Sequence, residues 1–192
     1  MATQSEIKYD RLMEKAEELF CQLGYKAVSM DEIAAAAGIS KMTIYKYFSS
    51  KEDLFFKVVE SVSDRAYIKL ENLITNVDGT IEKIDAMLNF SLDITNLFSV
   101  VFYKDVMENK YIAEKLVETK KIKSRKIFTE IITNGIEKGE IRNIDVEFIA
   151  ELLNIIIDGL LRNHSGIIAS EESIKYFSER FYDFLKYGLL GN

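Results

Sequence analysis

The sequence predicts an all-α fold with about nine helices. The chain of 192 residues contains no proline, a residue that removes a backbone hydrogen bond and clashes inside helices. Long stretches repeat apolar residues with the 3.6-residue period of an amphipathic helix. Short segments containing Gly, Ser or Asp separate them, as expected of helix ends. We expect a small N-terminal domain, residues 1–50, and a larger C-terminal helical domain, residues 51–192.

The composition indicates a globular chain with a sizeable core, because 48% of the residues are apolar and 29% are charged. No apolar run approaches the roughly 18 residues of a membrane span, and the charged first residues do not resemble a signal peptide. The single cysteine, Cys21, rules out an intramolecular disulfide and a cysteine-based metal site. We therefore expect a cytoplasmic protein with no metal or other cofactor and no membrane partner.

Residues 29–48 have the pattern of two short helices joined by a tight turn. Ser29 and Glu32 form a capping-box pattern, which predicts a helix beginning at the next residue. Gly38 ends this helix because glycine accommodates unusual backbone angles, and Ser40 caps a second helix. Two helices with a short Gly-containing connection form a helix-turn-helix. The pattern predicts that the second helix is presented to DNA.

The charge distribution agrees with this prediction better than the net charge of −6 does. Charge effects in solution are screened within roughly 10 Å, so local charge matters most. Residues 33–51 include three lysines and no acidic residue. The second helix offers donors suited to phosphate oxygens and base edges: Lys41, Thr43, Lys46 and Tyr47.

Helical periodicity continues along the rest of the chain. The patterns predict helices over 5–23, 51–76, 81–98, 100–107, 111–138, 146–164 and 171–190. The helix over 51–76 has no break near residue 60, which predicts a rigid connector between the two domains.

The predicted helix 146–164 is apolar on nearly every side and must be covered all round. Burial inside one large domain is the simple alternative, but we favour burial against a second copy. Together with the helix over 171–190 it would form an isologous four-helix interface. Two polar residues inside this helix, Asn154 and Asp158, need buried partners, so they either orient a ligand or fix the register of the interface.

Four segments together resemble the DNA-binding domain of TetR/AcrR-type transcriptional regulators: residues 24–34, 37–41, 44–48 and 51–54. The order, spacing and types of the residues resemble those of that domain from about residue 8 to residue 56. The resemblance implies a homodimeric repressor that binds a palindromic operator in double-stranded DNA. It also implies dimerisation through the last two helices, and release of the operator when a small molecule binds the C-terminal domain.

The resemblance further implies individual DNA contacts. Tyr45 and Lys51 match residues that meet phosphate, and Ser29 or Met30 matches a residue that touches the DNA backbone. Met42 departs from the common glycine and offers an apolar contact to a thymine methyl group. The complete predicted set is Ser29, Met30, Ser40, Lys41, Met42, Thr43, Tyr45, Lys46, Tyr47 and Lys51.

Aromatic residues in the C-terminal helices are candidates for the lining of a pocket for a small hydrophobic ligand, with core packing as the alternative. They are Tyr67, Phe90, Phe98, Phe102, Tyr103 and Phe128. An alternative function is a DNA-binding dimer of the same fold that has no small ligand. An enzyme is not expected, because one histidine cannot supply a di-metal bundle and no phosphate-loop or metalloprotease motif is present.

Overall fold

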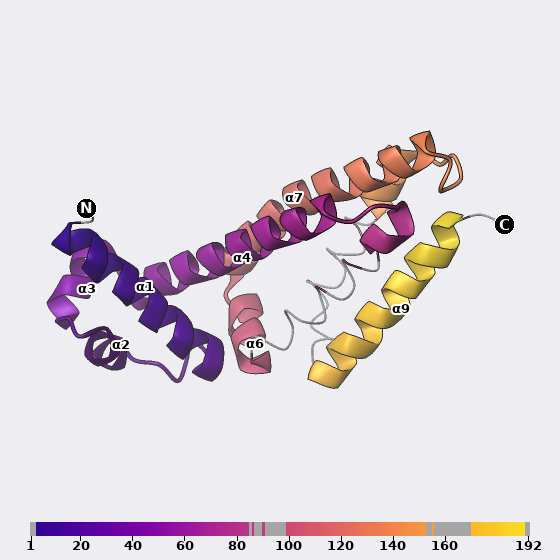
Figure 1. Cartoon of the computed structure of the whole chain (residues 1–192). Helices are drawn as coiled ribbons and strands as arrows, with labels where there is room; N and C mark the ends of the chain where they lie inside the picture. Colours follow the sequence, from indigo (N-terminus) through magenta and orange to yellow (C-terminus); the bar gives the residue numbers. More distant parts are fainter. Residues whose placement is uncertain are drawn as a thin grey trace. The chain divides into compact units, whose positions relative to one another are not determined.

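The computed structural model describes residues 3–84, 86, 90, 99–152, 155 and 170–190. Every regular element among these residues is an α-helix, which confirms the predicted all-α fold (Figure 1). The helices are α1 Gln4–Leu23, α2 Met30–Ala37, α3 Lys41–Tyr47, α4 Lys51–Thr75, α6 Val100–Glu108, α7 Lys110–Glu137 and α9 Glu171–Leu190. None of the described helices is long and apolar enough to cross a membrane.

Helix ends follow the local signals of the sequence, and α4 ends one residue before its predicted end. Two predicted helices are described only in part, since residues 80–84 and 146–152 are helical and most of the remainder lies outside the described residues. The predicted burial of the helix over 146–164 against a second copy also lies mostly outside them.

The chain divides into two compact units. Unit 1 contains Met1–Asp64 and Leu97–Ile112, and unit 2 contains Arg65–Asn96 and Ala113–Asn192. The single helix α4 therefore contributes to both units, whereas α6 belongs to unit 1 although it follows part of unit 2 in the sequence. Unit 1 is thus larger than the N-terminal domain of residues 1–50 expected from the sequence.

Three helices build the N-terminal part of unit 1, where α1 packs on α2 and α2 packs on α3 (Figure 1). Helix α1 begins with a capping box in which Thr3 and Glu6 exchange backbone-to-side-chain hydrogen bonds of 2.6 and 3.2 Å. The apolar faces meet in a buried core of Leu12, Ala16, Phe20, Ile33, Ala37 and Ile44. Leu23, the last residue of α1, is 51% exposed.

Helix α6 completes unit 1 by docking against the α1–α2 loop. The backbone N–H of Ser99 donates to the carbonyl of Cys21 at 3.2 Å, and the buried carboxylate of Asp105 accepts the backbone N–H of Lys26 at 3.3 Å. The Lys26 ammonium also pairs with Glu108, farther along α6. These bonds tie α6 to the loop that leads into the helix-turn-helix.

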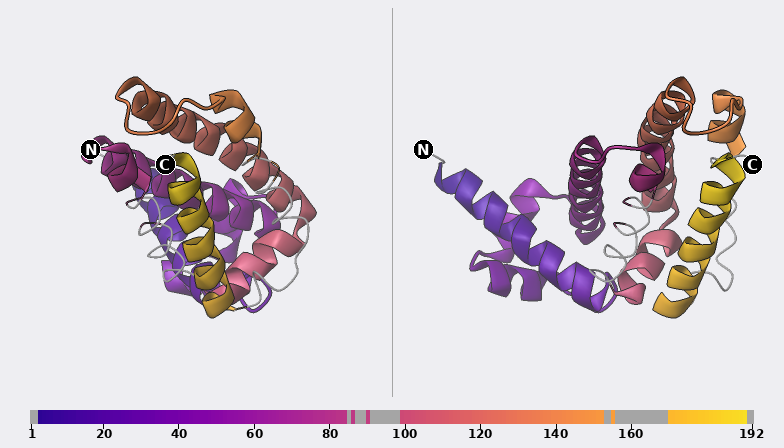
Figure 2. Two further views of the ribbon diagram at one scale, coloured as in Figure 1. Left: turned by 90° about the vertical axis from the view of Figure 1, so that its right-hand side faces the viewer. Right: turned by 45° about the vertical axis from the view of Figure 1, so that its right-hand side comes forward.

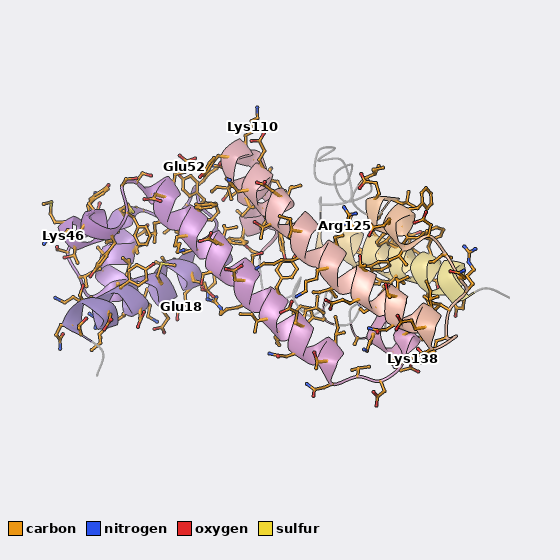
Figure 3. All side chains as sticks on the ribbon, turned by 90° about the horizontal axis from the view of Figure 1, so that it is seen from above. Glu18, Lys46, Glu52, Lys110, Arg125 and Lys138 are labelled. Carbon is orange, nitrogen blue, oxygen red and sulfur yellow. The ribbon has the colours of Figure 1, made fainter. Side chains whose placement is uncertain are left out.

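Unit 2 contains two apolar clusters that pack α7 against its neighbours. Ile74 of α4 packs with Ile127 and Ile131 of α7, and in Figure 3 the last turns of α4 lie beside α7. The second cluster consists of Ile84, Phe128, Ile132 and Ile141, and Phe181 of α9 packs against it. Helix α9 therefore packs against this second cluster.

Gly24 offers a direct test of the docking of α6, because its φ is +81° and its ψ is 166°. An added Cβ would lie 2.6 Å from both the Asp105 carboxylate and the Val101 side chain. We expect Gly24→Ala to lower the free energy of unfolding by about 2–4 kcal/mol, measured by urea denaturation. Gly38→Ala is the matched control in the same unit, since its φ is +62° and its Cβ would meet only Arg11 at 3.5 Å. We expect Gly38→Ala to lower the free energy of unfolding by about 1–2 kcal/mol. Equal losses of stability in the two variants would contradict the tight contact at Gly24.

Candidate nucleic-acid interface

Helix α2 is fixed at its first turn by a complete capping box. The Ser29 hydroxyl accepts the Glu32 N–H at 3.2 Å, and the Glu32 carboxylate accepts the Ser29 N–H at 2.7 Å. These bonds hold the pKa of Glu32 below its usual range. Met30 is only 6% exposed, so its side chain lies in the core and leaves Ser29 as the exposed member of this predicted pair.

The turn between α2 and α3 depends on Gly38, whose φ of 62° and ψ of 38° lie in the left-handed region. The N–H groups of Gly38 and Ile39 donate to the carbonyls of Ala35 and Ala34, which closes the end of α2. Arg11 of α1 donates to the Gly38 carbonyl at 3.4 Å. The sequence analysis missed Arg11, because it lies 27 residues away from the turn that it contacts.

Helix α3 begins with a second local cap. The Ser40 hydroxyl accepts the Thr43 N–H at 3.1 Å and lies 2.9 Å from the Thr43 hydroxyl. Ile44 is fully buried and anchors the inner face of the helix. Ser40 and Thr43 are therefore engaged with each other on the exposed side of the turn.

Lys41, the first residue of α3, forms an ion pair with α2. Its ammonium lies 2.8 Å from the carboxylate of Asp31, and this hydrogen bond raises the pKa of Lys41. Both side chains are solvent-exposed, so the pair contributes little to stability. The pair matters for the local charge, because it places the negative charge of Asp31 beside Lys41, a predicted phosphate contact. Sequence reasoning counted no acid from residue 33 to residue 51 and missed Asp31 just before that window.

Tyr47, at the end of α3, is held by the first turn of α1. Its hydroxyl donates to the Ser5 carbonyl at 3.1 Å and lies 2.8 Å from the Ser5 hydroxyl. Its ring packs edge-on against Tyr9, with 5.4 Å between the ring centroids. Tyr47 thus fastens α3 to α1 across 42 residues of sequence, a contact that no local pattern indicates.

Three predicted contact residues on α3 remain open to solvent. Met42 is 73% exposed and Tyr45 is 47% exposed, and Lys46 is exposed as well. Figure 3 shows Lys46 at the edge of the α1–α3 group. In the part of the chain that the structure describes, none of the three forms an ion pair or a side-chain hydrogen bond. Together they offer a cation, a phenol hydroxyl and an apolar thioether on one surface.

Lys51, the first residue of α4, lies over the ring of Tyr25, with its ammonium 4.2 Å from the ring centroid. Partial burial lowers the pKa of Lys51, and the negative charges of Asp105 and Glu32 oppose that shift. Burial also raises the pKa of Tyr25. The aromatic ring therefore sets the position of this predicted phosphate contact.

The pocket candidates that the structure describes are divided between the two units. Phe102 and Tyr103 belong to unit 1, where the Phe102 ring lies 5.8 Å from Phe55 and burial raises the pKa of Tyr103 to about 12. The candidates described in unit 2 are Tyr67, Phe90 and Phe128. Phe98, Asn154 and Asp158 lie outside the described residues. Among the described residues, no group of three His, Cys, Asp or Glu side chains is placed to hold a metal ion.

Comparison with known proteins agrees with the helix-turn-helix formed by α2 and α3. Residues 12–58, which extend from α1 through the helix-turn-helix into α4, match the family described as bacterial regulatory proteins, tetR family. This segment is a TetR-family DNA-binding domain. The HTH-type transcriptional repressor KstR2 of Mycolicibacterium smegmatis is 26% identical to the chain over 147 residues, which cover 73% of this chain and 71% of the relative. Such relatives are transcriptional regulators and not enzymes.

Solved structures of similar fold match this chain over nearly all of its length. A transcriptional regulator from Saccharomonospora viridis in complex with choline matches with a TM-score of 0.71 at 20% identity, covering 98% of this chain and 100% of the other. FadR from Bacillus subtilis in complex with stearoyl-CoA matches with a TM-score of 0.66 at 21% identity, covering 94% and 98%. At these identities the similarity extends to the fold alone.

The Lys41–Asp31 pair leads to a prediction about DNA affinity. Asp31→Asn removes the acid and leaves Lys41 free to meet a phosphate. We expect about 3–10-fold tighter binding to duplex DNA, and a salt dependence steeper by about one unit of log K against log[salt]. Fluorescence anisotropy across a salt series measures both quantities. Asp78→Asn makes the same change in total charge within unit 2 and is expected to leave both unchanged, so equal effects of the two variants would contradict this role of the pair.

Proposed function

We propose that this chain is a homodimeric transcriptional repressor of the TetR family that binds a palindromic operator through α3 and releases it when a small molecule binds unit 2. The observation that carries the proposal is the exposed surface of Met42, Tyr45 and Lys46 on a helix whose other face is anchored in the core. The alternative is a DNA-binding dimer of the same fold that responds to no small ligand.

The dimensions of α3 suit the major groove. Seven residues span about 10 Å of helix, which compares with a groove about 12 Å wide. In helix-turn-helix proteins the N-terminal residues of the second helix meet base edges while flanking groups meet phosphates. In the proposed complex Tyr45, Lys46 and Lys51 bind phosphates and supply most of the affinity.

The outer face of α9 supports dimerisation. Tyr176, Phe184 and Tyr187 are more than 60% exposed and follow one side of the helix, which Figure 2 shows as a single straight rod. Phe177 and Phe181 stack with 5.8 Å between their ring centroids, and Phe181 packs on the core of unit 2. An exposed aromatic stripe beside a packed face is typical of a protein–protein interface. A second copy, bound through α9 and the helix over 146–164, is the proposed occupant.

A polar pair in unit 2 supports ligand binding. The Tyr67 hydroxyl lies 3.2 Å from the Ser124 hydroxyl between α4 and α7, and burial raises the pKa of Tyr67. A few placed polar groups in apolar surroundings are what orient a small molecule in a protein. The ligand-bound structures with choline and stearoyl-CoA, which share this fold, give further support.

The alternative without a ligand has its own support. Phe128 is 6% exposed and Phe90 is 8% exposed, so both aromatic candidates are packed as core residues in the structure. A helical domain with a filled core serves dimerisation without needing a cavity.

Lys46 and Lys51 test DNA binding directly. The full-length protein is first used to select duplexes from a randomised pool, and the enriched sequence is then labelled for anisotropy. We expect Lys46→Ala with Lys51→Ala to weaken binding about 10–100-fold, and the salt slope to fall by about two units, because two phosphate contacts are lost.

Lys15→Ala serves as the control, because it removes a lysine of α1 that is paired with Glu18 at 2.8 Å. It is expected to bind the enriched DNA like the wild type. Failure to enrich any sequence, or unchanged binding by the double variant, would contradict the proposal.

The α9 stripe tests dimerisation. Phe184→Glu with Tyr187→Glu places two carboxylates at the proposed interface, where the partner copy would bury them without counter-charges. We expect a dimer of the wild type, and a monomer of the double variant, in sedimentation at micromolar concentration. Lys175→Glu introduces a carboxylate on a different, exposed side of α9 and should remain dimeric. A monomeric wild type would rule out the proposed interface.

A further inference from the structure

The polar side chains around α3 are largely engaged within the protein. Ser29 belongs to the α2 capping box, Ser40 and Thr43 pair with each other, and Lys41 pairs with Asp31. The Tyr47 hydroxyl is bound to Ser5. Most hydroxyl and amino groups that the sequence offers for base recognition therefore already have partners in the free protein.

The three exposed side chains of α3 that form no side-chain hydrogen bond or ion pair among the described residues, Met42, Tyr45 and Lys46, differ in their chemistry. Lys46 carries a point charge suited to phosphate, and Tyr45 carries a single hydroxyl that is suited to the same group. Met42 has no hydrogen-bond donor and is the most exposed large apolar residue among those described, at 73%. An apolar side chain so exposed in unit 1 has no role in the core.

We infer that Met42 determines operator specificity by packing against the C5-methyl group of a thymine in each half-site. This inference rests on the proposed function of α3. The thymine methyl is the apolar group on base edges in the major groove, so it is the feature that a thioether can distinguish. Met42 is the second residue of α3, within the N-terminal turn that meets base edges in helix-turn-helix complexes.

The flexibility of methionine suits this contact. Its unbranched side chain has three rotatable bonds and a polarizable sulfur, so it adapts to the position of the methyl group. The Ser40 hydroxyl caps α3 by accepting the Thr43 N–H, so the first turn that carries Met42 is held in helical form. Ile44 is fully buried and Met42 is 73% exposed, so the two side chains lie on different faces of α3.

Deoxyuridine provides the test because it differs from thymidine only by this methyl group. The full-length protein selects its site from randomised duplexes, and each thymidine of that site is replaced in turn by deoxyuridine. We expect one position per half-site to weaken wild-type binding about fourfold, and about fifteenfold when both half-sites are changed. Binding is measured by fluorescence anisotropy at fixed salt.

Two variants assign the effect to a side chain. Met42→Gln keeps the length of the side chain and removes its apolar end, so the difference between thymidine and deoxyuridine should disappear at that position. Thr43→Ser removes a neighbouring methyl group and keeps the hydroxyl that lies 2.9 Å from that of Ser40, so the difference should persist. Circular dichroism checks that both variants fold. Binding to unrelated duplex DNA at low salt checks that both still bind phosphates.

The outcomes separate the inference from the proposed function. A selected site without any deoxyuridine-sensitive thymidine, or a sensitivity that Met42→Gln retains and Thr43→Ser loses, overturns the role of Met42 and leaves the repressor proposal in place. Failure of the full-length protein to enrich any sequence overturns the proposed function together with this inference.

Discussion

Burial of the Phe55 ring is the interaction on which unit 1 depends. Phe55 of α4 is fully buried, and its ring contacts Phe20 of α1, Tyr25 of the loop and Phe102 of α6, at centroid distances of 5.0, 4.9 and 5.8 Å. Aromatic contacts of this kind add to the free energy gained from burial itself. The Lys51 ammonium lies over the Tyr25 ring, so the same aromatic cluster sets the position of this basic group, a proposed phosphate contact.

Charge is arranged around this cluster so that a buried carboxylate has partners. Asp105 is 5% exposed, and it accepts a backbone N–H from Lys26 and lies 3.9 Å from the Lys26 ammonium. Leaving a buried carboxylate without partners would be costly, so the α1–α2 loop and α6 hold each other in place. The loop leads directly into α2, and the orientation of the helix-turn-helix therefore follows from a contact with a helix from the later part of the chain.

The sequence predicted the features that local patterns encode. Capping residues and a glycine located α2 and α3, because these signals act within four residues of the helix ends. The contacts between Tyr47 and Ser5 and between Asp105 and Lys26 span 42 and 79 residues, and periodicity carries no information about such pairs.

Helix α4 contributes residues to both units. Residues 51–64 of this helix belong to unit 1 and residues 65–75 to unit 2, with no break in the helix between them. Lys51 begins the helix, and Tyr67, whose hydroxyl lies 3.2 Å from that of Ser124, is 16 residues farther along the sequence. The same helix therefore carries both the polar pair of unit 2 and the first basic residue after the helix-turn-helix.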